Sequence, residues 1–405
     1  MKTTNPRIVV VSTSVPPAPS GQARVLGHLL GPPPAEQCLL LADQSPFQHG
    51  ATPEAAFSNY RILSQRHLQW RRKGWANERL VRIDVFAGVF HSVVRRAIEI
   101  SRHVVAFDAS VLVACTASPF DLPACSLVAL RLRLPLITYL FDDPIYQWVP
   151  GPLRTFARRW EPIWSRIVTS VIVPNEAMQE EFAARRHRKS ILVRNPVPLG
   201  AFATVEQAWP TNPAQFRIVY TGSVYHAQAD AFLNLLRALD MLDGWSLHIY
   251  TSQSEAELTA YGIHGPKVCR HDHVDQAESY ATQQSADVLF LPLAFRSTIQ
   301  HVLRTSAPMK MGEYLASGRP ILVHAPADTF VANHIGTNRA GIVVDSADSN
   351  RLAEALRLIR THPDKRREVC KNALCLAQIY TVERAREAFW NAVTAAADLD
   401  AGQPA

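Results

Sequence analysis

The sequence lacks the features that would assign it to several common protein classes. It has no run approaching the roughly 20 apolar residues that a membrane-spanning helix requires. The apolar stretch near its start, 8–11, is too short for a signal peptide. Its six cysteines form no CxxC pair or other metal-ligand spacing, which favours reduced thiols. We therefore expect a cytoplasmic protein without a bound metal.

Glycine-rich phosphate loops are also missing. The 17 glycines form neither a GxGxxG fingerprint nor a Walker-type loop, which argues against ATP hydrolysis of that kind. No repeat of solenoid length and no low-complexity segment is present. What the sequence does contain is 405 residues with 47% hydrophobic content, enough to bury two ordinary cores.

Positive charge is concentrated in one half of the chain. Residues 1–200 hold 24 Lys and Arg against 14 Asp and Glu, a net +10, whereas 201–405 hold 18 against 21, a net −3. The clusters are RHLQWRRKGW (66–75), RTFARRW (154–160) and RRHRK (185–189). They suit either an anionic partner or solvated helix faces. They lack the stacking platforms of nucleic-acid readers, so we expect no nucleic-acid partner.

Apolar runs alternate with helical stretches, which is typical of parallel α/β sheets. The predicted strands are 8–11, 38–41, 111–114, 136–140, 171–173 and 191–193, then 217–221, 246–250, 268, 288–291, 321–323 and 342–343. A proline-rich connector follows Arg194. We predict two doubly wound, Rossmann-like domains, 1–198 and 199–380, facing a cleft, with a C-terminal helix and tail over 381–405. Ligands of such sheets bind at the carboxyl ends of the strands.

Each predicted domain begins with a strand that ends in a glycine turn. Ser20 and Gly21 follow the first strand, and Gly222 and Ser223 follow the first strand of the second domain. Glycine there lets a ligand approach the backbone and a helix N-terminus. An ordinary strand-to-helix loop is the alternative, but the repetition supports a binding role. Asp230, on the helix that follows, is interpreted as a surface charge.

The most informative segment is TSAPMKMGEYLASGRPILV (305–323). Pro308 is predicted at the first helical position, with Ser306 or Ala307 as the cap. Gly318 is the expected left-handed stop, since Pro320 follows and cannot continue the helix.

The same segment places charged side chains at a helix N-terminus. Arg304 and Lys310 supply two cations there, which outlines a diphosphate site. Glu313, three residues after Lys310 on the same face, can accept hydrogen bonds from two adjacent hydroxyls, as on a ribose. The alternative is that Lys310 and Glu313 merely pair with each other. Asp142, after the strand 136–140, either contacts a substrate or belongs to an Asp-Pro turn.

These motifs resemble the nucleotide-sugar glycosyltransferases of the GT-B fold, in particular family 4-like members. The resemblance is carried by the Ser20-Gly21 loop, YTGSVY (220–225), ADVLFLP (286–292) and APMKMGEYLASGRPILV (307–323). In that family the glutamate matching Glu313 binds the ribose, and the preceding loop meets the diphosphate.

Two departures from the family pattern concern the donor. Thr305 stands where the family commonly has a glutamate that touches the donor sugar, and Ser223 and Gln228 replace a typical Arg and Lys. The diphosphate cations are then expected to be Arg304 and Lys310.

The resemblance implies a retaining, metal-independent transferase of hexosyl or related groups in polysaccharide biosynthesis. Its donor would be a nucleoside diphosphate sugar, with no cofactor besides this co-substrate, and its acceptor a glycan or lipid-linked glycan. The site residues are expected to be Arg304 and Lys310 for catalysis, Gly222, Ser223, Ser306, Pro308, Met309 and Glu313 for the donor, and Ser20, Gly21 and Asp142 on the acceptor side.

Two other functions and one location belong to the same interpretation. A same-fold nucleotide-sugar enzyme such as an epimerase, and a non-catalytic binding protein, remain alternatives. The basic first half, with Trp70 and Trp75 beside Arg71, Arg72 and Lys73, leads us to expect peripheral attachment to an anionic surface at the inner face of a membrane.

Overall fold

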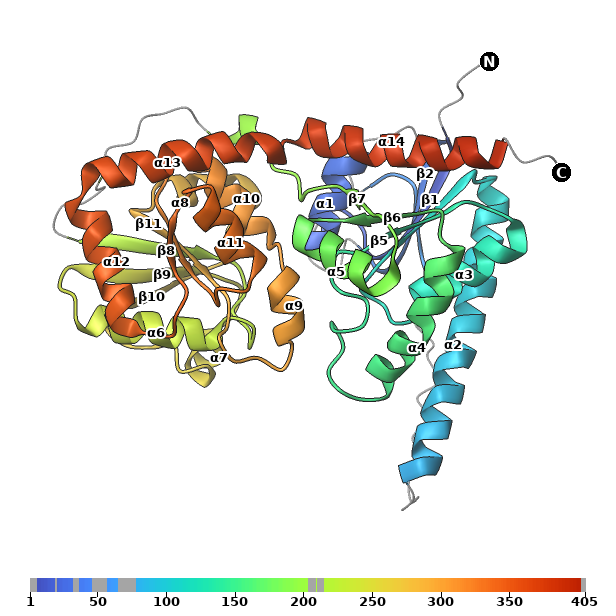
Figure 1. Ribbon diagram of the computed structural model, residues 1–405, viewed down its shortest axis with the longest axis horizontal. Helices are drawn as coiled ribbons and strands as arrows, with labels where there is room; N and C mark the ends of the chain where they lie inside the picture. The colour runs from blue at the N-terminus through green and yellow to red at the C-terminus, as the bar shows by residue number, and fades with distance from the viewer. Residues whose placement is uncertain are drawn as a thin grey trace. The chain divides into compact units, whose positions relative to one another are not determined.

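The computed structural model describes residues 6–18, 20–31, 36–45, 57–64, 78–202, 209 and 215–401. The chain forms two compact units. The first comprises Met1–Arg194 with Glu383–Ala405, and the second comprises Asn195–Val382. Each is built around a parallel sheet with helices packed on it (Figure 1). The predicted α/β class with two doubly wound sheets is confirmed.

The sheet of the first unit has the strand order β3-β2-β1-β4-β5-β6-β7. Its strands are β1 Ile8–Ser14, β2 Cys38–Gln44, β3 Tyr60–Ile62, β4 Val111–Cys115, β5 Leu136–Tyr139, β6 Ser170–Val173 and β7 Ile191–Leu192. Strands β4 and β5 are buried throughout, because helices cover both faces of a parallel sheet. Continuous apolar runs revealed all of these strands except β3, which is short and partly exposed at the sheet edge.

The helices of the first unit include one from the far end of the chain. They are α1 Gly21–Leu30, α2 Glu78–Phe107, α3 Asp121–Leu132, α4 Pro152–Ile167, α5 Glu176–Arg186 and α14 Val382–Ala401. In α14 the Trp390 indole donates to the Leu29 carbonyl at 3.2 Å, and Arg386 donates to the His28 carbonyl at 2.8 Å. The C-terminal helix, which the sequence left outside both domains, therefore belongs to the first unit.

The sheet of the second unit has the strand order β10-β9-β8-β11-β12-β13. Its strands are β8 Phe216–Thr221, β9 Trp245–Tyr250, β10 Val268–His271, β11 Val288–Pro292, β12 Ile321–His324 and β13 Ile342–Val344. Its helices are α6 Ala229–Asp240, α7 Glu255–Ala260, α8 Gln276–Gln284, α9 Gln300–Thr305, α10 Met309–Ala316, α11 Phe330–Thr337, α12 Ser349–Thr361 and α13 Pro363–Ala377.

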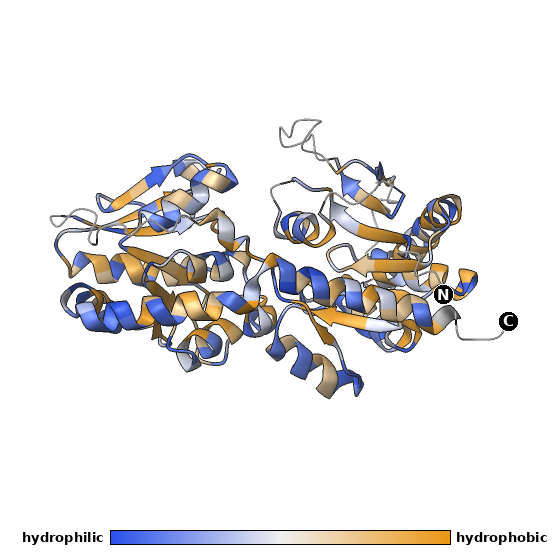
Figure 2. Cartoon of the chain, turned by 90° about the horizontal axis from the view of Figure 1, so that it is seen from above, coloured by the Kyte–Doolittle hydropathy of each residue, from blue (hydrophilic) through white to orange (hydrophobic). Residues whose placement is uncertain are grey.

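Each unit has its own apolar core. Trp164 stacks on Phe182 in the first unit, with ring centroids 6.0 Å apart, and both are buried. In the second unit Phe232 meets Phe290 edge-on at 5.3 Å. Figure 2 shows hydrophobic residues along the strands, while the helices carry both hydrophobic and hydrophilic faces. Each sheet is therefore stabilised by its own burial of apolar surface.

Strand order marks one place in each sheet where a ligand is expected. The order reverses between β1 and β4 in the first unit and between β8 and β11 in the second. In open α/β sheets, ligands bind outside the carboxyl ends of the strands at this switch point. The residues that follow β1, β4, β8 and β11 are therefore the first candidates for function.

The chain enters the second unit pressed against α10. The Asn195 side-chain amide donates to the Ala307 carbonyl at 2.7 Å, just before this helix begins. A β-carbon on Gly312 would lie only 2.6 Å from a methyl of Val197, which is itself buried. Gly312 is thus required by close packing, and the connector fixes the position of α10.

We predict that Gly312→Ala destabilises the protein by about 1–3 kcal/mol, because the stiff Val197 side chain must shift to admit the new methyl. Gly88→Ala, in helix α2, is the matched control. A β-carbon there meets nothing within 4 Å. The control should gain about 0.5–1 kcal/mol through helix propensity. Denaturant unfolding of both variants measures this, and a neutral or stabilising Gly312→Ala would contradict it.

Candidate functional site

Strand β8 ends in a glycine turn at the switch point of the second unit. Gly222 has φ +114°, a conformation that residues with a β-carbon rarely adopt. Its N–H donates to the Tyr250 carbonyl at 2.8 Å, and the Thr221 N–H donates to the buried Tyr314 hydroxyl at 3.2 Å. The turn is therefore held from β9 and from α10, and it leaves room for close approach to the backbone.

Lys310, in the first turn of α10, lies at this glycine turn. Its Nζ donates to the Tyr220 hydroxyl at 2.5 Å and lies 3.9 Å from the centre of the same ring. The Tyr220 hydroxyl in turn donates to the Ser223 carbonyl at 2.8 Å. A β-carbon at Gly222 would lie 3.3 Å from Nζ. The predicted residues Lys310, Gly222 and Ser223 are thus brought together.

Tyr220 acts here as a neutral phenol. Burial raises its pKa far above the ordinary value, and the neighbouring Tyr314 and Tyr225 add to the shift. A neutral hydroxyl can accept from Lys310 while donating to the Ser223 carbonyl. The Lys310 side chain is thus held at the turn by a hydrogen bond and by the ring face.

Glu313 lies on the next turn of α10 and is 3% exposed. Its Oε2 accepts from the Gln283 side-chain amide at 2.9 Å, and the same amide nitrogen lies 3.2 Å from the Thr221 hydroxyl. Gln283 therefore orients the carboxylate and ties it to the end of β8. The hydrogen bonds of Lys310 and Glu313 described here go to different partners, Tyr220 and Gln283.

The start of α10 differs from the prediction by one residue. Pro308 occupies the cap position, with φ −62° and ψ 140°, and Met309 is the first helical residue. The prediction that Pro308 is the first helical residue, capped by Ser306 or Ala307, is therefore wrong. The fixed φ of proline suits either position. Pro308 offers no side-chain acceptor to the first N–H groups, and Gly318 ends the segment at φ +74° as predicted.

Arg304 does not share the contacts of this cluster. It closes α9, and its Nε lies 3.3 Å from an Asp328 carboxylate oxygen, both side chains being about half exposed. Exposed ion pairs contribute little to stability, so Asp328 holds this guanidinium only weakly. Ser306 ends α9, and its N–H reaches the Leu303 carbonyl at 3.4 Å. The diphosphate role predicted for Arg304 remains a prediction.

Asp230 has a structural role that was not predicted from the sequence. Its carboxylate accepts the N–H of Phe295 at 3.1 Å and the N–H of Arg296 at 2.8 Å. It thereby fixes the loop after β11 to the first turn of α6, rather than serving as a surface charge. An acidic residue in a first helical turn was the available signal. The residue that it holds lies 65 positions away, which the local pattern does not reveal.

The switch point of the first unit is lined by hydroxyl and amide groups. Ser20 caps α1 by accepting the Ala23 N–H at 3.1 Å, and its hydroxyl lies 2.7 Å from that of Ser14. Gly21 is the first helical residue and is exposed. The Gln22 side chain bonds the Thr13 hydroxyl at 2.7 Å and the Thr116 carbonyl at 2.7 Å. These contacts fix the loops after β1 and β4.

Asp142 follows β5 on the same edge of that sheet. The residue as a whole is exposed, but protein atoms around its carboxyl partly remove water from it, and this desolvation and then the adjacent Asp143 raise its pKa. The turn is made by Asp143, whose carboxylate accepts the N–H groups of Ile145 and Tyr146 at 2.8 and 2.9 Å. The hydrogen bonds of the Asp-Pro turn therefore go to Asp143 and not to the Asp142 carboxylate. Its predicted substrate contact remains a prediction.

The basic clusters have different surroundings. The cluster 185–189 is used internally, because Arg185 and Arg186 both pair with Glu161, which is fully buried. The cluster 66–75, with Trp70 and Trp75, lies outside the described residues.

Among the helices that the structure describes, none is both long and apolar enough to cross a membrane.

His324, at the end of β12, is a buried histidine beside the loop that Asp230 holds. Its Nδ1 donates to the Val344 carbonyl at 3.0 Å, so its Nε2 accepts from the Asn234 amide at 3.1 Å. The Phe295 ring lies against it, 4.6 Å between centroids. Burial lowers the pKa of His324 to about 4.

We predict that His324 makes the protein less stable as pH falls. Its pKa is about 4 when folded against 6.5 ordinarily. Between these values only the unfolded chain takes up the proton, so the free energy of unfolding falls from pH 6.5 to 4, by about 3 kcal/mol. His324→Gln keeps a donor and an acceptor and should remove that part of the slope.

Denaturant unfolding at several pH values measures this, with the exposed His264→Gln as the control. The difference between each variant and the native protein isolates one histidine, since His248 also has its pKa lowered to about 4. An unchanged pH slope in His324→Gln would contradict the assignment.

Comparison with known proteins agrees with this architecture. Residues 215–361 match the model of the family described as Glycosyl transferases group 1. No curated protein matches the sequence. Sucrose-phosphate synthase from Thermosynechococcus elongatus is similar in structure, with a TM-score of 0.68 and 14% identity over 98% of this chain and 100% of that chain.

Two further solved structures are similar over nearly all of both chains. HepE from Anabaena, in complex with UDP-glucose, has a TM-score of 0.66 and 13% identity over 96% of this chain and 100% of its own. A Listeria monocytogenes protein assigned as a UDP-N-acetylglucosamine 2-epimerase has a TM-score of 0.58 and 9% identity, covering 97% and 96%. The chain has the GT-B fold, and the family match confirms the predicted resemblance in the second unit.

Proposed function

We propose that the protein is a glycosyltransferase that moves a sugar from a nucleoside diphosphate sugar to an acceptor held by the first unit. One observation carries the proposal: Lys310 lies at the Gly222 turn, one helical turn from the oriented carboxylate of Glu313. The cation suits a diphosphate, and the carboxylate suits the adjacent hydroxyls of a ribose. The family match over 215–361 covers both.

The chemistry proposed for these residues is electrostatic. During transfer, the bond between the anomeric carbon and the diphosphate oxygen breaks, and its electron pair leaves with the diphosphate. A new bond forms between that carbon and the acceptor oxygen, whose proton passes to the departing diphosphate. In this proposal, Lys310 and the N–H groups at the start of α10 stabilise the charge that develops on the leaving group.

We further propose that the reaction retains the configuration at the anomeric carbon and uses no metal. Lys310, together with Arg304 when it is released from Asp328, would neutralise the diphosphate charge. In metal-dependent enzymes a bound metal ion has this role. Anomer analysis of the product by NMR, with and without EDTA, tests both points. An inverted product, or activity lost in EDTA and restored by a divalent ion, would contradict them.

An epimerase is the second candidate, because the Listeria protein assigned that activity has a similar structure. The two functions differ in what they need. An epimerase converts the nucleotide sugar alone, whereas a transferase releases nucleoside diphosphate only when an acceptor is present. A thermal-shift screen of UDP, GDP, ADP and their sugars identifies the donor, and chromatography of the products then separates the two functions. UDP is the first to test, since HepE was solved with UDP-glucose.

We predict that Glu313→Ala removes most of the affinity for the matched nucleoside diphosphate, at least about tenfold, as expected when charge-assisted hydrogen bonds are lost. The affinity of Glu313→Gln should lie between those of the native protein and Glu313→Ala. Isothermal titration calorimetry measures both, with the exposed Glu255→Ala in the same unit as the control. Equal affinity in native protein and Glu313→Ala would refute the ribose role.

We predict that Lys310→Ala lowers turnover by about a hundredfold, as for the loss of one electrostatic donor in other enzymes. Arg304→Ala should cost less, because that guanidinium is half exposed and paired with Asp328. Steady-state kinetics with the natural donor measures both, and Lys371→Ala, an exposed lysine of the same unit, is the control. Near-normal turnover in Lys310→Ala would place the diphosphate site elsewhere.

A further inference from the structure

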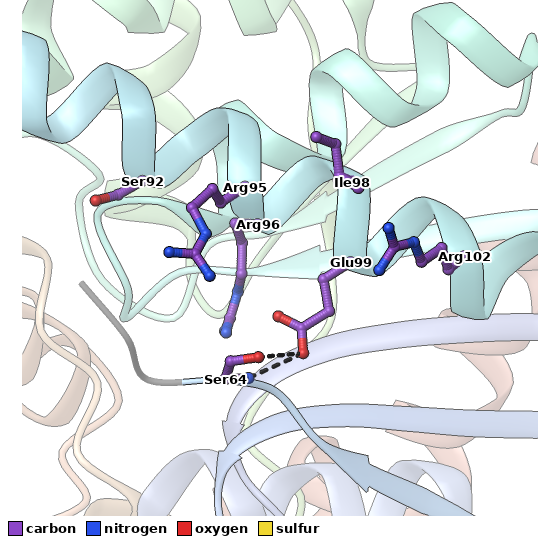
Figure 3. Close-up of a pocket in the computed structure, with 7 residues that line it drawn as sticks. All are labelled: Ser64, Ser92, Arg95, Arg96, Ile98, Glu99 and Arg102. Carbon is purple, nitrogen blue, oxygen red and sulfur yellow. Dashed lines mark hydrogen bonds between the residues drawn. The ribbon is translucent and has the colours of Figure 1, made fainter. Parts of the chain in front are cut away.

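A pocket of about 330 Å³ lies between α2 and the end of β3 in the first unit (Figure 3). Its lining residues are Ser64, Ser92, Arg95, Arg96, Ile98, Glu99 and Arg102. Those from α2 recur every three or four positions, so one face of the helix forms the wall. Three of them are arginines and one is a glutamate, which gives this wall an excess of positive charge.

The glutamate that lines the pocket, Glu99, accepts hydrogen bonds from another residue of the pocket wall. Glu99 Oε1 accepts the N–H of Ser64 at 3.0 Å and its hydroxyl at 2.7 Å, as the dashed lines in Figure 3 show. It thereby fixes the chain just after β3 to α2. Because both hydrogen bonds go to Ser64, Glu99 serves mainly to build the pocket wall.

Arg96 is buried at the back of this wall, with its side chain 2% exposed. Its Nε donates to Asp121 at 2.9 Å and its Nη2 to Asp43 at 2.5 Å. Within the described part of the chain, its Nη1 has no hydrogen-bond partner. Leaving part of a buried guanidinium unpaired is costly. Burial also raises the pKa of Asp121, while the Arg96 charge beside it acts in the opposite direction.

Arg95 and Arg102 are exposed at the rim of the pocket. The hydrogen bonds and ion pairs found among the described residues include none from either side chain. Figure 3 shows both guanidinium groups beside the pocket-lining residues of α2. Guanidinium groups bind phosphoryl oxygens with two parallel hydrogen bonds, which Lys cannot do.

The surface of α2 beside the pocket is apolar. Phe90 is 53% exposed, Ile98 44% and Val105 62%, and their spacing puts them on one side of the helix. Ile98 also lines the pocket. A ligand that carries a phosphoryl group on an apolar body would therefore meet complementary surface on both parts.

The pocket opens at the carboxyl edge of the sheet. Ser64 follows β3, and Asp43, the partner of Arg96, lies near the end of β2. Strand β3 is two positions from β1, whose end carries Ser14 and Ser20 at the switch point. Since neighbouring strands are about 4.8 Å apart, the two places are separated by about 10 Å along this edge. One substrate can span that distance.

We propose that this pocket binds a phosphoryl group, and that the bearer is a lipid-linked acceptor. The phosphoryl group would lie between Arg95 and Arg102, over Arg96, with its apolar part along Phe90, Ile98 and Val105. The acceptor role rests on the proposed transferase function. The phosphoryl site itself does not, since it stands on the residues of α2 alone.

The experiment uses the full chain with Arg95→Ala and Arg102→Ala combined. Both residues are exposed, so the variant should keep its thermal midpoint. Its probes are inorganic phosphate and glycerol 3-phosphate by calorimetry, and vesicles of phosphatidylcholine with and without phosphatidic acid by co-sedimentation. Arg131→Ala with Arg158→Ala is the control, because it removes the same charge from exposed sites of the same unit.

The expected result is binding of phosphatidic acid vesicles that weakens about tenfold or more in the Arg95/Arg102 variant and not in the control. Loss of soluble phosphate binding only would support the pocket and overturn the lipid bearer. Equal losses in variant and control, or none in either, would overturn the pocket. Nucleoside diphosphate affinity should be unchanged in all variants, so failure of the donor proposal would show separately.

Discussion

The contact between Lys310 and Tyr220 determines how the candidate site of the second unit is arranged. It joins the end of β8 to the first turn of α10 beside Gly222, where φ of +114° favours glycine. Burial raises the pKa of Tyr220 far above its ordinary value, so its hydroxyl is neutral and can accept from Lys310. The connector that bonds Ala307 and packs on Gly312 holds α10 in the position that this contact needs.

Local sequence patterns predicted whatever depends on short stretches of chain. Buried parallel strands were recognised as apolar runs, a glycine turn was predicted at Gly222, and a left-handed residue was predicted at Gly318, which has φ +74°. Strand β3 was missed because a short edge strand has no such run. The cap of α10 was displaced by one residue because proline suits either position.

Local sequence patterns could not predict the residues that orient the side chains of the candidate site. Gln283 holds Glu313 across 30 residues, and Asp230 holds Phe295 across 65. Gln283 lies on α8 and Glu313 on α10, whereas Asp230 in the first turn of α6 reaches the loop after β11. Both contacts depend on the packing of elements that are distant in the sequence, so local patterns do not reveal the partner. The internal use of Arg185 and Arg186 by Glu161 was hidden for the same reason. The sequence thus predicted the candidate site, while tertiary contacts determine how its residues are held.

The proposed function requires a nucleoside diphosphate to bind at the Gly222 turn, against Lys310 and Glu313. Hydrogen–deuterium exchange of the full chain, with and without a saturating nucleoside diphosphate, measures this binding site. We expect slower exchange of backbone amides in 220–225 and 309–316, with little change in the strands of the first unit. Saturated binding that leaves both segments unprotected, or that protects only the first unit, would contradict it.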